Sequence, residues 1–230
     1  MSAFLASLND IIKTEYFMRK ILIIAGILLC CLNMQAQDMK SLFVALPDSL
    51  SPLLTEVNRA DFGDFLASNM KAQVKNRFGN TSEMLKLTDD YLLLKVSAVS
   101  TAEMKLLPLN DSVKVICVVQ TYQGPVSDSR VSFYDTSWKS LPAENFLTLP
   151  AEDAFYKTPV TETQTDSLKN LRTRADMFLL KAVLSEKDTS LSFVYTTPDY
   201  LDKETLKEIK PYLVAVPLKY VWQNGRFVRL

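Results

Sequence analysis

The sequence predicts an α+β protein in which antiparallel β-meander sheets pack against amphipathic helices. Three observations lead to this fold class. Residues 83–136 alternate apolar and polar side chains in successive short runs, as half-buried strands do. Two stretches, 61–77 and 166–184, repeat apolar residues at helical spacing. The chain of 230 residues is long enough for one medium domain or two small subdomains.

The same patterns suggest how the chain is organised. We expect residues 37–150 to form a subdomain of helices plus β-meander, 151–165 a connection, and 166–230 a subdomain of a helix plus an antiparallel hairpin. The two halves contain a short echo, VSFYDT at 131–136 and LSFVYT at 191–196. This echo could come from a duplication that produced two similar subdomains, or from chance similarity of two strands. We prefer chance similarity.

The N-terminal segment 18–36 has the features of a secretory signal peptide. Arg19 and Lys20 precede twelve uncharged residues, 21–32, and the small residue Ala36 follows them. That run is too short for a stable transmembrane helix, which needs about 20 apolar residues. We therefore expect cleavage near Ala36 and export to the periplasm or the medium.

Residues 1–17 form a mixed preface to that signal. Met18, followed by two basic residues, is the better start, so we interpret 1–17 as a mis-annotated start; a long n-region is the alternative. Cys30 and Cys31 lie inside the apolar run, and no small residue precedes Cys30. A lipid anchor is therefore not expected.

Composition narrows the function classes. The chain has no histidine, which removes the commonest general base and zinc ligand. Basic and acidic residues balance at 26 each, which gives no reason to expect nucleic-acid binding. Cys117 is the one cysteine beyond the signal, and its apolar neighbours predict a buried packing role. We expect no cofactor, no metal site and no catalytic residues.

The first helical stretch follows a shorter candidate helix start at Ser51-Pro52. We expect a helix over 61–77, capped by Asp61 and ended by Gly79. Its apolar stripe consists of Phe62, Phe65, Leu66, Met70 and Val74.

Within the meander, residues 113–122 are apolar on both faces in their middle. This pattern predicts a central strand that is covered on both sides. Further strands are expected at 92–98, around Met104, and at 130–135, with turns at Asp89-Asp90 and at Asn110.

The second half begins after a long connection without periodicity, 137–165. We expect a helix over 166–184, a strand over 191–197 and a short helix capped by Asp202. The chain then ends in a hairpin around Asn224-Gly225, because both residues tolerate a positive φ.

Acidic pairs are the main alternative to a non-catalytic protein. Asp89-Asp90, Glu152-Asp153 and the pair Asp61 and Asp64 could supply two carboxylates for a hydrolase. Their positions in turns and in a first helical turn favour turn formation and capping instead.

Three aromatic residues, Tyr122, Tyr134 and Trp138, fall on outward positions or in a loop. They are the candidate ligand-binding residues, since aromatic rings stack on a sugar or an extended peptide. The alternative, which we prefer, is that a helix covers this face, because amphipathic helices must bury their apolar stripes.

Four stretches resemble one family of uncharacterised exported proteins of Bacteroides-type bacteria, the domain of unknown function 3256. They are LPDSLSPLL (46–54), SNMKAQVKNR (68–77), SEMLKLTDDYL (82–92) and FVYTTPDYL (193–201). The resemblance extends across nearly the whole chain beyond the signal. It implies secretion and an α+β fold, but no activity and no catalytic residues.

These inferences favour an exported envelope protein that acts as a non-catalytic binding or interaction module. Its partner would be a protein, a peptide or a glycan of the envelope. The alternative is a hydrolase that acts on an envelope glycan or peptide through a carboxylate pair. Two carboxylates about 5 to 9 Å apart in a deep cleft would favour the hydrolase.

Overall fold

A seven-stranded antiparallel sheet forms the centre of the protein, in a computed structural model that describes residues 20, 38–159 and 161–230. Its strands pair in chain order: β1 (Gln73–Lys75), β2 (Thr81–Leu87), β3 (Tyr91–Ser97), β4 (Ser100–Pro108), β5 (Lys114–Gln123), β6 (Ser127–Asp135) and β7 (Ser140–Leu141). A second antiparallel sheet has the order β11-β10-β9-β8, built from β8 (Leu180–Leu184), β9 (Ser190–Tyr195), β10 (Leu218–Gln223) and β11 (Arg226–Arg229). The predicted fold class, α+β with antiparallel sheets, is confirmed.

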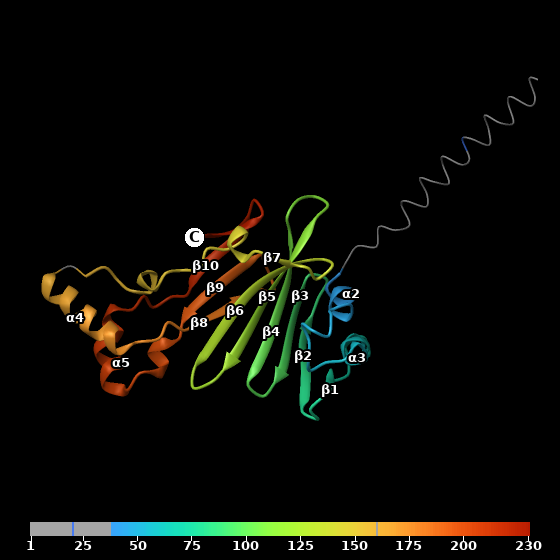
Figure 1. Cartoon of the computed structure of the whole chain (residues 1–230), viewed down its shortest axis with the longest axis horizontal. Coiled ribbons are helices and arrows are strands. Elements are labelled where there is room, and N and C mark those ends of the chain that lie inside the picture. The colour runs from blue at the N-terminus through green and yellow to red at the C-terminus, as the bar shows by residue number, and fades with distance from the viewer. Residues whose placement is uncertain (1–19, 21–37, 160) are drawn as a thin grey trace, which may run out of the picture. The chain divides into compact units, whose positions relative to one another are not determined.

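Four α-helices accompany the sheets in the described ranges: α2 (Met39–Val44), α3 (Glu56–Ala67), α4 (Glu162–Arg174) and α5 (Lys203–Ile209). Each begins with a side chain that accepts a backbone N–H of the first turn: Asp38, Thr55, Thr161 and Asp202. The cap predicted at Asp202 is therefore confirmed. Figure 1 shows α2 and α3 beside the β1–β3 end of the large sheet, and α4 beside α5.

The predictions about the N-terminus concern residues outside the described ranges, apart from Lys20. They are the start at Met18, the signal 18–36 with its cleavage near Ala36, and the fate of Cys30 and Cys31. No helix in the described part of the chain is both long and apolar enough to cross a membrane.

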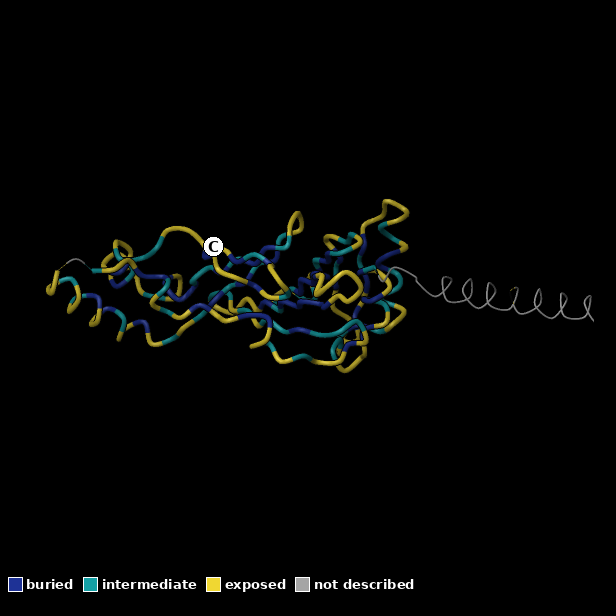
Figure 2. Tube along the Cα trace, turned by 90° about the horizontal axis from the view of Figure 1, so that it is seen from above, coloured by how far each residue is buried: buried dark blue, intermediate teal, exposed yellow. Residues whose placement is uncertain are grey.

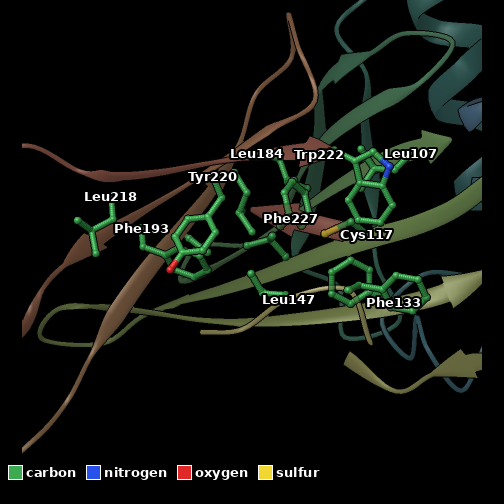
Figure 3. Packing of buried hydrophobic residues seen from close by; sticks show 14 of the residues in the cluster. Leu107, Cys117, Phe133, Leu147, Leu184, Phe193, Leu218, Tyr220, Trp222 and Phe227 are labelled. Carbon is green, nitrogen blue, oxygen red and sulfur yellow. The ribbon is translucent and has the colours of Figure 1, made fainter. Parts of the chain in front are cut away.

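The two sheets enclose one hydrophobic core, which contains a cluster of aromatic rings. The Phe133 ring stacks on Phe146 at 5.0 Å between ring centroids, and Trp222 meets Phe227 edge-on at 5.0 Å. Figure 3 shows Phe133, Trp222 and Phe227 between the strands of the two sheets, together with the Cys117 sulfur. Figure 2 shows that buried stretches alternate with exposed loop tips along the chain.

Cys117 occupies the middle of β5, the central strand predicted over 113–122. Residues 115–119 of this strand are buried on both faces, as expected. The Cys117 side chain is fully buried, and burial raises the pKa of its thiol. The predicted packing role of Cys117 agrees with this environment.

Polar side chains of the large sheet cover the outer edge of β8, the edge strand of the second sheet. The backbone N–H groups of three alternate β8 residues donate to Asp128 Oδ1 (3.1 Å), Ser129 Oγ (3.0 Å) and Glu103 Oε2 (2.7 Å). Uncapped edge strands invite pairing with other chains. These three side chains therefore close the edge and join the two sheets.

A second core lies on the opposite face of the large sheet, under α2 and α3. Met39 and Phe43 of α2 and Phe62 of α3 are almost fully buried there. They pack over alternate strand residues such as Leu106 and Ile116, which lie in register on β4 and β5. Because successive side chains of a strand point to opposite faces of the sheet, the same strands supply residues to both cores.

The helix predicted over 61–77 is wrong in its position. The helix α3 begins and ends earlier than predicted, and Thr55 rather than Asp61 caps it. Asn69 then adopts a left-handed backbone with φ 54°, which stops the helix. Val74, assigned to the helical stripe, instead lies in β1 and pairs with β2.

The helix predicted over 166–184 is also wrong at its C-terminal end. The helix α4 ends at Arg174, and residues 180–184 form β8 with alternating burial. Pairing with β9 and packing on the large sheet outweigh the weak helical periodicity of this stretch. The start predicted at Ser51-Pro52 is likewise not a helix.

Other local predictions are confirmed. The two-residue turn Asn224-Gly225 joins β10 to β11, and both residues have positive φ, 49° and 77°. The stretch 137–165 is mostly irregular, but it contains β7, two short 3₁₀ turns at Ala143–Asn145 and Glu152–Phe155, and the start of α4.

Candidate ligand groove

A groove of about 450 Å³ lies on the helix-side face of the large sheet. Its floor is formed by residues of β3 to β6, and its wall by Phe43 of α2 and the segment 46–54. We call it the helix-side groove. Its volume falls in the range of small-molecule pockets, about 300–1,000 Å³.

The sheet register gives the floor a gradient from apolar to polar. One row runs from Leu94 on β3 through Ala102 on β4 and Gln120 on β5 to Arg130 on β6. The next row runs through Met104 and Val118 to Ser132 in the same direction. Within these two rows the side chains are therefore apolar on β3 and β4 and polar on β6.

All three aromatic candidates line this groove. Tyr122 is 57% exposed and stands at the rim. The Tyr134 ring packs on Trp138 at 5.7 Å between centroids. The structure thus brings together Tyr122, Tyr134 and Trp138, which lie on two strands and a turn.

Trp138 is part of the groove wall and not a free aromatic platform. It is only 7% exposed, and its indole Nε1–H donates to the Leu42 carbonyl oxygen at 3.0 Å. Its backbone has a φ of 64°, in a turn where Asp135 Oδ1 accepts the N–H groups of Ser137 and Lys139. The alternative that we prefer from the sequence, that a helix covers this face, therefore holds for Trp138 but not for the exposed Tyr122.

Ionic contacts and hydrogen bonds hold the wall segment of the groove in place. Asp48 accepts from Arg59 Nη1 at 3.1 Å and also pairs with Arg77. Hydrogen bonds from Arg59 and then Arg77 lower the pKa of Asp48. Arg59, which is 3% exposed, also donates to the carbonyl oxygens of Val44 (3.2 Å) and Leu54 (2.9 Å). One buried guanidinium therefore connects both ends of the wall.

Three polar residues of the floor are not predicted from the sequence: Gln120, Arg130 and Ser132. The sequence does contain a hint of them, because they are polar, even-numbered positions on strands whose odd-numbered face is apolar. Without the register between β5 and β6, however, these positions cannot be assigned to one groove.

The acidic pairs are engaged elsewhere. Asp90 pairs with Lys105 at 2.9 Å, and Glu152 and Asp153 both pair with Arg172, at 3.0 and 2.6 Å. Asp64 contacts Lys40 at 3.4 Å. None of these acids is among the lining residues of the helix-side groove in the described structure.

Glu103 is buried on the opposite face of β4, in the contact between the two sheets. Burial raises its pKa, although the Leu184 N–H and the Tyr91 hydroxyl stabilise its carboxylate. Burial also raises the pKa of Tyr91. Lys105, which is buried as well, lies 5.7 Å from the Tyr91 ring centroid and donates to the Glu186 carbonyl oxygen. This cluster joins the sheets and faces away from the groove.

Comparisons with known proteins identify relatives but no activity. The family model described as "Protein of unknown function (DUF3256)" matches residues 31–227. A solved structure, a domain of an uncharacterized protein from Porphyromonas gingivalis W83, is 31% identical and has a TM-score of 0.75. The match covers 85% of this chain and 100% of that one. A search of the curated proteins finds no match.

Proposed function

The chain belongs to the DUF3256 family of proteins of unknown function, and on that premise we propose that it is a non-catalytic ligand-binding protein of the cell envelope. The signal-like segment 18–36 is the basis for export. The helix-side groove is the binding site in this proposal. From the sequence we expect a protein, a peptide or a glycan of the envelope as the partner; the groove itself requires only a ligand with an apolar and a polar part.

One observation carries the proposal: the groove combines a preformed apolar floor with a few accessible polar groups. Ligand pockets typically have this composition, because apolar contact supplies affinity and polar groups fix orientation. In the described part of the chain no buried side-chain nitrogen or oxygen lacks a partner. Among the lining residues Arg130 is exposed and Gln120 and Ser132 are half-buried, so the polar groups of the groove are open to solvent or to a ligand.

The hydrolase alternative receives less support from this site. A glycosidase needs two carboxylates across the bond that is cleaved. The described lining residues include no Asp or Glu. The groove is thus better suited to holding a ligand than to acid–base chemistry.

Capture from an envelope extract tests the proposal. The purified chain is incubated with extract and re-isolated, and bound molecules are identified by mass spectrometry. Ser132→Trp places a large ring on the groove floor, and Val113→Trp, at an exposed position outside the lining, is the matched control. We expect a molecule that both the wild type and the control retain and Ser132→Trp loses. Equal capture by all three proteins would place the binding site elsewhere.

A further inference from the structure

Resting on the proposed function, we propose that the ligand of the helix-side groove is a single-tailed anionic amphiphile, with its charged head at Arg130 and its aliphatic tail over β3 and β4. Fatty acids and alkyl phosphates share this chemistry. The proposal follows from the charge, the burial and the arrangement of the lining residues.

Arg130 is the only cationic side chain among the described residues that line the groove. In the described structure Arg130 is exposed, and its guanidinium forms no hydrogen bond or ion pair with the protein. Asp128, two residues earlier on β6, makes no ion pair with Arg130, and its Oδ1 accepts the Leu180 N–H at 3.1 Å. A guanidinium without a protein partner is suited to a carboxylate or a phosphate, which it can bind through two parallel N–H donors.

The neighbours of Arg130 suit the same headgroup. Gln120 lies opposite Arg130 on β5, and Ser132 follows two residues later on β6. Both line the groove and both are half-buried. Their amide and hydroxyl groups can donate to an anionic oxygen next to the guanidinium.

The apolar part of the groove suits an aliphatic tail. Four buried residues continue the same rows away from Arg130: Leu94, Ala102, Met104 and Val118. Phe43 and Leu46 add the opposing wall. These six residues offer an alkyl chain a contact surface of apolar side chains.

Two other ligand classes fit less well. An extended peptide gains affinity by pairing with a sheet edge, whereas the groove floor is a sheet face whose backbone groups are paired on β4 and β5. A sugar stacks on an open aromatic face; Trp138 is buried with its N–H donated to Leu42, and the exposed ring, Tyr122, stands at the rim and not over the apolar floor.

Calorimetric titration of the purified full chain tests the proposal. The probes are dodecanoate, dodecyl phosphate and octanoate, with uncharged dodecanol as the comparison. We expect saturable one-to-one binding of the anionic twelve-carbon probes. Shortening the tail should weaken binding by up to about fourfold per methylene removed. Arg130→Gln should weaken anion binding about tenfold or more and leave dodecanol unaffected.

Arg229→Gln, at an exposed position of β11 outside the groove lining, is the matched control and should bind like the wild type. Ser132→Trp should abolish binding of every probe. Arg130-dependent binding of either anion supports the proposal, and the tighter of the two identifies the headgroup.

Three results would overturn it. They are no binding of any probe, equal affinity for dodecanol and dodecanoate, or an Arg130→Gln effect no larger than that of Arg229→Gln. The proposed function would survive each of these if Ser132→Trp still lost the molecule captured from envelope extract. If Ser132→Trp still bound the probes and still retained the molecule captured from envelope extract, both proposals would be wrong.

Discussion

The two faces of the seven-stranded sheet are closed in different ways. On one face a second sheet buries stacked rings, such as Phe133 on Phe146, and Glu103 and Ser129 accept the N–H groups of β8. On the other face α2, α3 and the segment 46–54 cover only part of the strands and leave the helix-side groove. Because side chains alternate between the two faces, one set of strands supplies both a closed core and a surface available for binding.

The largest expected effect is on the closed face. Phe133→Ala removes a ring that is 1% exposed and that contacts Phe146, Trp222 and Phe227. We expect the free energy of unfolding to fall by about 3–5 kcal/mol, because a large cavity forms in a well-packed core. Denaturant unfolding measures it. A loss below about 1 kcal/mol would show that the two faces do not differ as described.

Arg59→Met should have the next largest effect, and it acts on the groove wall. The change leaves the carbonyl oxygens of Val44 and Leu54 without their donor. We expect a loss of about 1–3 kcal/mol in the free energy of unfolding, together with weaker ligand binding. The control is Lys40→Met, which breaks only a largely exposed ion pair with Asp64. Unchanged ligand affinity in Arg59→Met would contradict the role of the wall.

Glu103→Ala tests the connection between the sheets. The variant leaves the Leu184 N–H without an acceptor in a buried position. We expect a cost of about 1–3 kcal/mol and faster hydrogen exchange in β8, with unchanged ligand affinity. Reduced ligand affinity without any change in β8 exchange would mean that the two faces are coupled in a way that these contacts do not explain.

The raised pKa of Glu103 also predicts a pH dependence. The folded chain holds this proton more tightly than the unfolded chain, whose pKa is close to the ordinary 4.5. The stability that the group contributes is therefore greatest below about pH 4.5 and falls as the pH rises toward the folded-state pKa. Glu103→Gln lacks this titration. Unfolding measured from about pH 4 to 8 should show the wild type losing stability relative to the variant, and a constant difference would contradict this.

Tyr122→Ala should have the smallest effect on stability. Tyr122 is largely exposed at the groove rim, so we expect a change within about 0.5 kcal/mol. Its effect on ligand binding should exceed its effect on unfolding. A destabilisation comparable to that of Phe133→Ala would show that Tyr122 belongs to the core.

Much of the fold follows from local signals in the sequence. Asn224-Gly225 predicts a turn because few other pairs accept two positive φ angles, and residues 113–122 predict a doubly covered strand. The errors arise where tertiary contacts override local periodicity. Asn69 stops a helix whose stripe continues past it, and the apolar residues of 180–184 fit a helix or a strand equally well until β9 pairs with them.

The candidate site shows the same division. Tyr122, Tyr134 and Trp138 can be selected as aromatic residues on an outward face, but their proximity depends on the β5–β6 register and on the turn before β7. Arg130 cannot be selected, because an arginine on a strand is usually a solvated charge. Only the strand register shows that Arg130 lies in one row with Gln120, Ala102 and Leu94, and so next to the apolar part of the groove.

Methyl-selective NMR of the chain titrated with dodecanoate tests the contrast between the faces most directly. Met104 and Val118 point to the groove side of the sheet, and Leu107 and Val115 belong to the core between the sheets. We expect ligand contacts and large chemical-shift changes for the methyl groups of Met104 and Val118, and none for those of Leu107 and Val115. Ligand contacts to the second pair, or to neither pair, would contradict it.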